Sequence, residues 1–176
     1  MYSMFEVAYN KTKEWGPGSC FFTFYLMSIS LIFTLFFYRV YTESFTKILE
    51  NFTIQENLPL FIDSLFFAPP FETLLYNVFL TSVFTWFKCR PRTIIFAVTL
   101  IFSASHYTNG ILAPFLVFLP GLAFQWNYYL YHEHKQYIWG FLSTTILHFA
   151  YNFTLCVVIP MIYVVIDIYY GINLIK

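Results

Sequence analysis

Long stretches without a charged residue alternate with short polar segments along this chain. The first stretch, residues 20–38, holds nineteen residues without Asp, Glu, Lys or Arg, close to the roughly 20 residues that a helix needs to cross a bilayer. Similar apolar stretches follow at residues 70–87, 93–106, 111–131, 137–158 and 160–170. The pattern predicts an all-α, polytopic bundle of about six transmembrane helices.

Prolines and glycines set the expected boundaries of these helices. The apolar run that begins at residue 58 meets Pro69 and Pro70. Because proline is tolerated in the first turn of a helix, we expect the spanning helix to begin at residue 70. Residues 58–67 would then form a separate re-entrant or interfacial segment. Asn109-Gly110 predicts a turn between two later spans.

The composition supports a membrane location. Hydrophobic residues make up 59% of the chain and charged residues 10%, whereas soluble domains average about 25% charged residues. We therefore expect a polar N-terminal segment at residues 1–19, a single membrane domain at residues 20–176, and a polar interfacial stretch at residues 39–57. A net charge of zero argues against nucleic acid as a partner. The three cysteines are too widely spaced for a disulfide framework or a zinc knuckle.

The basic residues predict the orientation. With the N-terminus inside, seven basic residues fall on inner segments, namely Lys11, Lys13, Lys88, Arg90, Arg92, Lys135 and Lys176. Only Arg39 and Lys47 fall on outer segments. The positive-inside tendency therefore places both termini on the inner side of a multi-pass protein.

Three ionisable residues stand out because they lie in apolar surroundings, Glu72, His106 and His148, and a fourth polar residue, Asn152, lies one helical turn beyond His148. A charged side chain at mid-membrane costs roughly 2.5–3.5 kcal/mol on insertion scales, so each one requires a reason. In the predicted topology all four fall in the outer half of the membrane. His148 and Asn152 are four residues apart and share one helix face. The four side chains can therefore meet in one cavity.

A carboxylate, two imidazoles and an amide can together deprotonate a water, shuttle its proton and stabilise an oxyanion. The same residues also fit interhelical hydrogen bonding, proton or ion handling, or a zinc site formed by Glu72 and the two histidines. His132-Glu133-His134 is interpreted as a solvated turn rather than a metal site. No cofactor and no metal are expected.

Three short motifs carry a resemblance to a known family. Ala68-Pro-Pro-Phe-Glu-Thr-Leu-Leu-Tyr-Asn77, Phe102-Ser-Ala-Ser-His106 and His148-Phe-Ala-Tyr-Asn152 follow one another on the predicted spans. In order and spacing they resemble the motifs of the CAAX-protease and bacteriocin-processing family of intramembrane glutamic endopeptidases, over a core of about residues 58–158. The resemblance implies that Glu72 and His106 activate the attacking water, and that His148 and Asn152 stabilise the oxyanion.

The resemblance implies a substrate that is a membrane-associated peptide or protein, prenylated or bacteriocin-like. Two positions depart from the family pattern, because Thr73 stands at its second glutamate and Asn77 at its arginine. Their joint replacement removes both members of an expected ion pair. The leading hypothesis is an intramembrane peptidase. The alternatives are a catalytically inactive family member acting as an immunity or adaptor protein, and a small proton-coupled transport protein.

Overall fold

The computed structural model describes residues 59, 61–111, 113–158 and 161. Within this part every element is a helix and no strand occurs, which confirms the all-α prediction. The predicted segments 1–19, 20–38 and 39–57 lie outside the described residues, as does nearly all of 160–170. The elements are η1 (Asp63–Phe67), α5 (Ala68–Glu72), η2 (Thr73–Leu80), α6 (Thr81–Trp86), α7 (Pro91–Ser105), η3 (His106–Asn109), α8 (Ala113–Glu133), α9 (Tyr137–Phe153) and η4 (Thr154–Val158).

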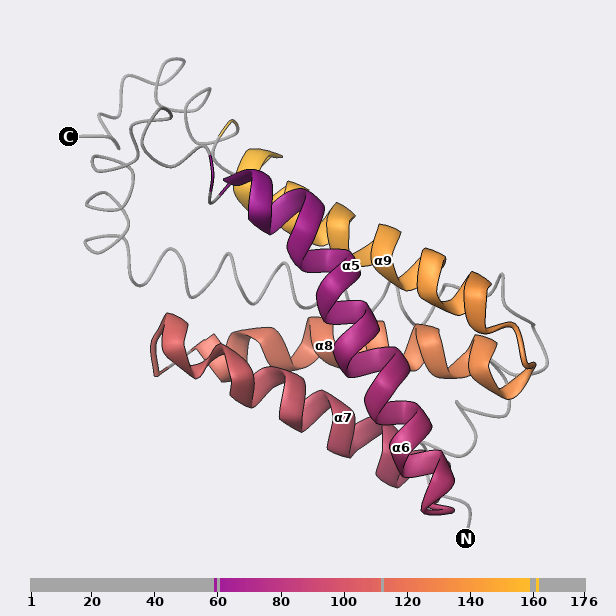
Figure 1. The fold of residues 1–176 in the computed structure, drawn as a ribbon. Coiled ribbons are helices and arrows are strands. Elements are labelled where there is room, and N and C mark those ends of the chain that lie inside the picture. Colours follow the sequence, from indigo (N-terminus) through magenta and orange to yellow (C-terminus); the bar gives the residue numbers. More distant parts are fainter. Residues whose placement is uncertain (1–58, 60, 112, 159–160, 162–176) are drawn as a thin grey trace, which may run out of the picture.

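The expected break at Pro69-Pro70 is wrong. The four elements η1, α5, η2 and α6 form one continuous rod that crosses the other helices (Figure 1). The junction residues Ala68, Thr73 and Thr81 all have right-handed helical backbone angles. The rod continues because η1 and η2 are π-helices, with one more residue per hydrogen-bonded turn. The wider turn of η1 accommodates the two prolines, which have no N–H to donate. It also relieves the clash of a proline ring with the preceding turn.

This rod has its polar residues inside and its apolar residues outside. The buried residues of η2 and α6 are Thr73, Asn77 and Thr81. The large exposed side chains of the same elements are Leu74, Leu75, Phe79 and Trp86. A helix on the surface of a soluble protein has the opposite arrangement. Lipid is as apolar as a leucine side chain, so a membrane helix can turn apolar residues outward and use its polar ones against its neighbours.

Helix α8 lies at the centre of the described bundle and packs against both α7 and α9 (Figure 1). Its buried contacts with α7 are aromatic and aliphatic, made by Ile94, Ile95, Val98, Trp126, Tyr129 and Leu130. Almost every residue of α8 from Pro120 to Leu130 is buried. Because its neighbours cover it, α8 can also hold the amides of Gln125 and Asn127 inside the bundle.

The helix Tyr137–Val158 is long and apolar enough to cross a membrane, with the bounds expected from the sequence. It is the single such helix among the described residues, so the count of six spans is not confirmed. Helix α7 has only 15 residues, and the central helix α8 contains the buried polar residues Gln125 and Asn127. The turn at Asn109-Gly110 is confirmed, with a φ of 118° at Gly110 that glycine adopts without strain.

Candidate active site

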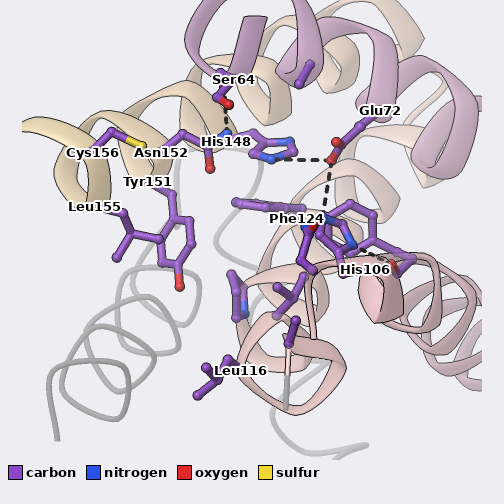
Figure 2. Close-up of a pocket in the computed structure, with 16 residues that line it drawn as sticks. Ser64, Glu72, His106, Leu116, Phe124, His148, Tyr151, Asn152, Leu155 and Cys156 are labelled. Carbon is purple, nitrogen blue, oxygen red and sulfur yellow. Dashed lines mark hydrogen bonds and ion pairs between the residues drawn. The ribbon is translucent and has the colours of Figure 1, made fainter. Parts of the chain in front are cut away.

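A cavity of about 350 Å³ opens where the rod, α7, α8 and α9 meet. Its polar lining includes Ser64, Glu72, His106, Asn109, His148 and Asn152. The remaining lining is largely apolar and includes Leu116, Val117 and Leu155. Figure 2 shows Glu72 pointing from the rod toward both imidazoles. The structure therefore brings all four residues singled out in the sequence to one cavity.

Glu72 lies between the two imidazoles without a direct hydrogen bond to either. Its Oε2 is 3.9 Å from His106 Nε2 and 3.7 Å from His148 Nε2. Both separations exceed hydrogen-bond distance. Oε2 is buried and makes no hydrogen bond within the described part of the chain, while the Glu72 side chain as a whole is 24% exposed. This oxygen can accept a hydrogen bond from a water or a substrate group in the cavity.

His106 is held by the backbone of its own motif. Its Nδ1 lies 2.9 Å from the carbonyl oxygen of Phe102, and Ser105 Oγ donates to the same oxygen at 2.7 Å. A carbonyl oxygen only accepts, so Nδ1 carries the proton of this bond. In the neutral ring Nε2 is then unprotonated, and its lone pair faces Glu72. The four-residue spacing of the motif thus determines the tautomer of the histidine.

His148 is held largely by the packing of aromatic rings around it. Its side chain is 6% exposed and stacks on the ring of Phe124, with centroids 4.4 Å apart and planes inclined by 26°. The edge of Phe102 meets it from another direction at 5.9 Å. With both rings in place, His148 Nε2 stays directed at Glu72.

Asn152 connects α9 to the start of the rod. Its Nδ2 donates to the carbonyl oxygen of Ser64 at 2.9 Å (Figure 2). In η1 the bonds run five residues back, as in the bond from Ala68 N–H to Asp63 O. The next donor in that series would be Pro69, which has no N–H. Ser64 O is therefore left without that helical partner, and Asn152 supplies the donor.

The part of the chain that contains these four residues matches a known protein family. Residues 54–154, more than half of the chain, match the family model described as Type II CAAX prenyl endopeptidase Rce1-like. The chain belongs to this family. No significant match was found among curated proteins or among solved structures. The matched segment includes Glu72, His106, His148 and Asn152, and it confirms the resemblance found from the three motifs. At the level of the family, the protein is a membrane protease.

The two departures from the family pattern are both buried on the rod. Asn77 Nδ2 donates to Gln125 Oε1 at 2.8 Å, and Gln125 Nε2 donates to Thr81 Oγ1 at 2.8 Å. Thr73 is fully buried, one turn before Asn77. Two neutral residues thus stand where the family pattern has charged ones, and Asn77 is hydrogen-bonded across to α8. This arrangement avoids the desolvation of an ion pair.

Two contributors to the site, Phe124 and Gln125, were not found from the sequence, and neither was Asn127, which connects α8 to α9. Phe124 gave no signal, because aromatic residues make up 24% of the chain. Gln125 and Asn127 did give one, since an amide inside an apolar span is a common interhelical hydrogen-bonding group. The residues identified from the sequence were ionisable ones and the asparagine one helical turn after His148, so both amides were missed.

Within the described ranges, no group of three or more His, Cys, Asp and Glu side chains is arranged so that it could hold a metal ion. The expectation of a solvated turn is wrong for His132, whose ring lies half-buried against Tyr128, Tyr129 and Tyr137. It holds for His134, which is exposed.

Proposed function

We propose that the protein is an intramembrane endopeptidase that hydrolyses a peptide bond of a membrane-associated peptide or protein with a water activated by Glu72 and His106. The observation that carries the proposal is the approach of Glu72 Oε2 to His106 Nε2, at 3.9 Å, on the wall of a cavity. Membership of a protease family supports the same reaction class.

The separation of Glu72 and His106 suits a single water between them. A water that donates to two acceptors at ~2.8 Å each holds them about 4.5 Å apart when its angle is tetrahedral. The distance of 3.9 Å between Glu72 Oε2 and His106 Nε2 therefore needs to increase only slightly to admit this water. Both atoms are acceptors, because Glu72 is ionised in this scheme and His106 carries its proton on Nδ1. The oxygen lone pair of the water is then left for attack on a carbonyl carbon.

The reaction proceeds by transfer of one proton through Glu72. As the water oxygen bonds to the carbonyl carbon, its proton moves to the carboxylate and the carbonyl oxygen becomes an oxyanion. The protonated Glu72 then gives this proton to the amide nitrogen, and the carbon–nitrogen bond breaks. The products are a carboxyl group and an amine. His106 orients the water throughout.

His148 and Asn152 serve as oxyanion donors in this scheme. The amide of Asn152 has two N–H groups, of which one bonds to Ser64 O and the other is available to a ligand. Phe124 fixes the ring of His148 by stacking on it, with Nε2 on the Glu72 side of the cavity. Donors whose direction is set before the substrate arrives are the most effective in stabilising charge.

The substrate class follows from the family and from the lining of the cavity. The family name specifies CAAX prenyl endopeptidases, so a prenylated protein terminus is the first candidate and a bacteriocin-like peptide the second. The apolar lining near Leu116, Val117 and Leu155 suits an apolar residue beside the cleaved bond. The setting is a multi-pass protein in the bilayer, with both termini inside as the basic residues predict.

The test uses purified protein in nanodiscs and a quenched fluorescent peptide ending in a CAAX sequence, with and without a farnesyl group on its cysteine. Glu72→Gln and His106→Ala are expected to abolish cleavage while the protein still inserts and folds. Asp63→Asn, an exposed carboxylate on the same rod, is the control and keeps its activity. Full cleavage by Glu72→Gln would falsify the proposal. Proton-driven flux that depends on Glu72, with no cleavage by the wild type, would favour a transport protein.

A further inference from the structure

The buried amide of Gln125 connects the rod that carries Glu72 to the central helix α8. Its Oε1 accepts from Asn77 and its Nε2 donates to Thr81. Gln125 and Thr81 are fully buried and Asn77 is nearly so. With both ends of the amide engaged, Gln125 determines both the rotation and the height of the rod against α8.

The neighbour of Gln125 holds the other side of the site. Phe124 stacks on His148, and Gln125 binds the rod five residues beyond Glu72 through Asn77. Two consecutive residues of α8 therefore hold the two groups whose Oε2 and Nε2 atoms lie 3.7 Å apart. The helix that contains both residues carries none of the four predicted catalytic side chains.

In lipid, hydrogen bonds of this kind contribute more to the orientation of a helix than hydrophobic contact does. The outer face of the rod is apolar and meets a solvent as apolar as the bundle interior, so burying apolar area does not favour one rotation over another. The inward face of η2 and α6 presents Thr73, Asn77 and Thr81. An unpaired amide there would be costly, so the rotation in which Asn77 and Thr81 meet Gln125 is selected.

We infer that Gln125 is a positioning residue for the reaction: through Asn77 and Thr81 it sets the placement of the Glu72 carboxylate relative to His106 and His148. This inference rests on the proposed function, because it assigns Gln125 to the same catalytic centre. It predicts a loss in kcat rather than in substrate affinity, since Gln125 does not line the cavity.

The experiment compares Gln125→Met, Asn77→Leu and their combination in the nanodisc cleavage assay. Each single variant is expected to lower kcat by about tenfold to a hundredfold, the range produced by an ångström-scale misplacement, with KM within about twofold of the wild type. The double variant is expected to lose no more than Gln125→Met, because that change already removes the bond to Asn77 together with the bond to Thr81. Gln125→Glu restores the geometry, since a neutral carboxyl group can accept from Asn77 and donate to Thr81.

Thr99→Val is the matched control. Thr99 is fully buried like Gln125, but its hydroxyl donates to Ile95 O within its own helix and connects no two helices. Its kcat is expected to equal that of the wild type. Unfolding midpoints in detergent are measured for all variants, so that a loss of folding is recognised.

The outcomes separate the two proposals. An inactive Glu72→Gln together with a fully active Gln125→Met overturns the positioning role and leaves the proposed function standing. Equal losses in Gln125→Met, Gln125→Glu and Thr99→Val, in step with their unfolding midpoints, reduce Gln125 to a structural residue and overturn the inference as well. Cleavage by Glu72→Gln overturns both.

Discussion

The side-chain amide of Asn152 donates to the backbone carbonyl of Ser64, 88 residues earlier in the chain, at 2.9 Å. The bond exists because Pro69 cannot donate to that carbonyl in the π-helical turn of η1. A proline in the first motif thus prepares an acceptor for the asparagine of the third motif. The two motifs are connected through the backbone as well as through Glu72 and His148.

Pro69→Ala is expected to weaken this connection. The new N–H of residue 69 can bond to Ser64 O and compete with Asn152. The loss of one hydrogen bond of about 1 kcal/mol corresponds to about a fivefold decrease in kcat. The unfolding midpoint should stay the same or rise, because alanine is the better helix former. Steady-state cleavage and thermal unfolding in detergent measure the two effects.

Pro70→Ala is the matched control for this change. An N–H at residue 70 would bond five residues back to Leu65 or four back to Phe66, and neither carbonyl is the acceptor of Asn152. Its kcat should therefore remain close to that of the wild type. Equal losses in both proline variants would contradict the link between Pro69 and Asn152.

The hydrogen bond of His106 to Phe102 O predicts an order among substitutions of this histidine. His106→Gln places an oxygen near the position of Nε2 and still accepts from the water. His106→Asn reproduces only the bond to Phe102 O, which Nδ1 makes in the wild type. We expect kcat to fall in both variants, and to fall about tenfold further in the asparagine variant, which loses one hydrogen bond to the water.

Ser105→Ala tests whether the tautomer of His106 depends on a second donor. Ser105 Oγ shares the Phe102 carbonyl with His106, but His106 keeps its own bond when the hydroxyl is removed. Activity within about twofold of the wild type is therefore expected, a smaller change than the loss of one ordinary hydrogen bond would cause.

For the two substitutions of His106, the contradicting outcome is a higher activity of His106→Asn than of His106→Gln. In that case the lone pair of Nε2 does not face the water.

Gly121→Ala is expected to disturb the site through Phe102. An added Cβ would lie 2.6 Å from Phe102 Cδ1. The ring of Phe102 packs against those of His106 and His148, with centroid distances of 4.8 and 5.9 Å. The ring must move, which overpacks the core at a cost of about 1–3 kcal/mol. Both kcat and the free energy of unfolding should decrease.

Gly140→Ala provides a control with a similar clash elsewhere. Its Cβ would lie 2.9 Å from Tyr131 Cβ, and neither residue lines the cavity. Stability should fall by a similar amount, while kcat measured below the unfolding midpoint stays near the wild-type value. A parallel loss of kcat in both glycine variants would mean that the effect of Gly121→Ala is one of general folding.

Chelators are expected to leave cleavage unchanged. Two ligands of a tetrahedral zinc ion at ~2.0–2.1 Å lie about 3.3 Å apart, whereas Glu72 Oε2 lies 3.7 and 3.9 Å from the two imidazole nitrogens. Both separations are wider than a zinc ion would hold them, and the proposed mechanism uses Glu72 and His106 without a metal. The measurement is the cleavage rate after incubation with 1,10-phenanthroline and with EDTA. Inactivation that added zinc reverses would support the zinc site considered from the sequence.

The sequence by itself determined the helical class, the family and the four residues around which the hypothesis is built. Uncharged runs report helices in lipid because a bilayer excludes unpaired polar groups, and Tyr137–Val158 bears this out. Glu72, His106 and His148 were identifiable because ionisable side chains are rare in such runs, and Asn152 because it shares a helix face with His148. Their catalytic roles, the six spans and the orientation of the termini remain predictions.

Only the tertiary structure decided how these residues are held. That Pro69 and Pro70 lie inside a continuous rod depends on the π-helical turns around them, and no local propensity reports a change in winding. The role of Gln125 depends on its hydrogen bonds to Asn77 and Thr81, which lie more than 40 residues away in the chain. A pattern along one helix shows which face is polar, but the partner that the face meets depends on how the helices pack.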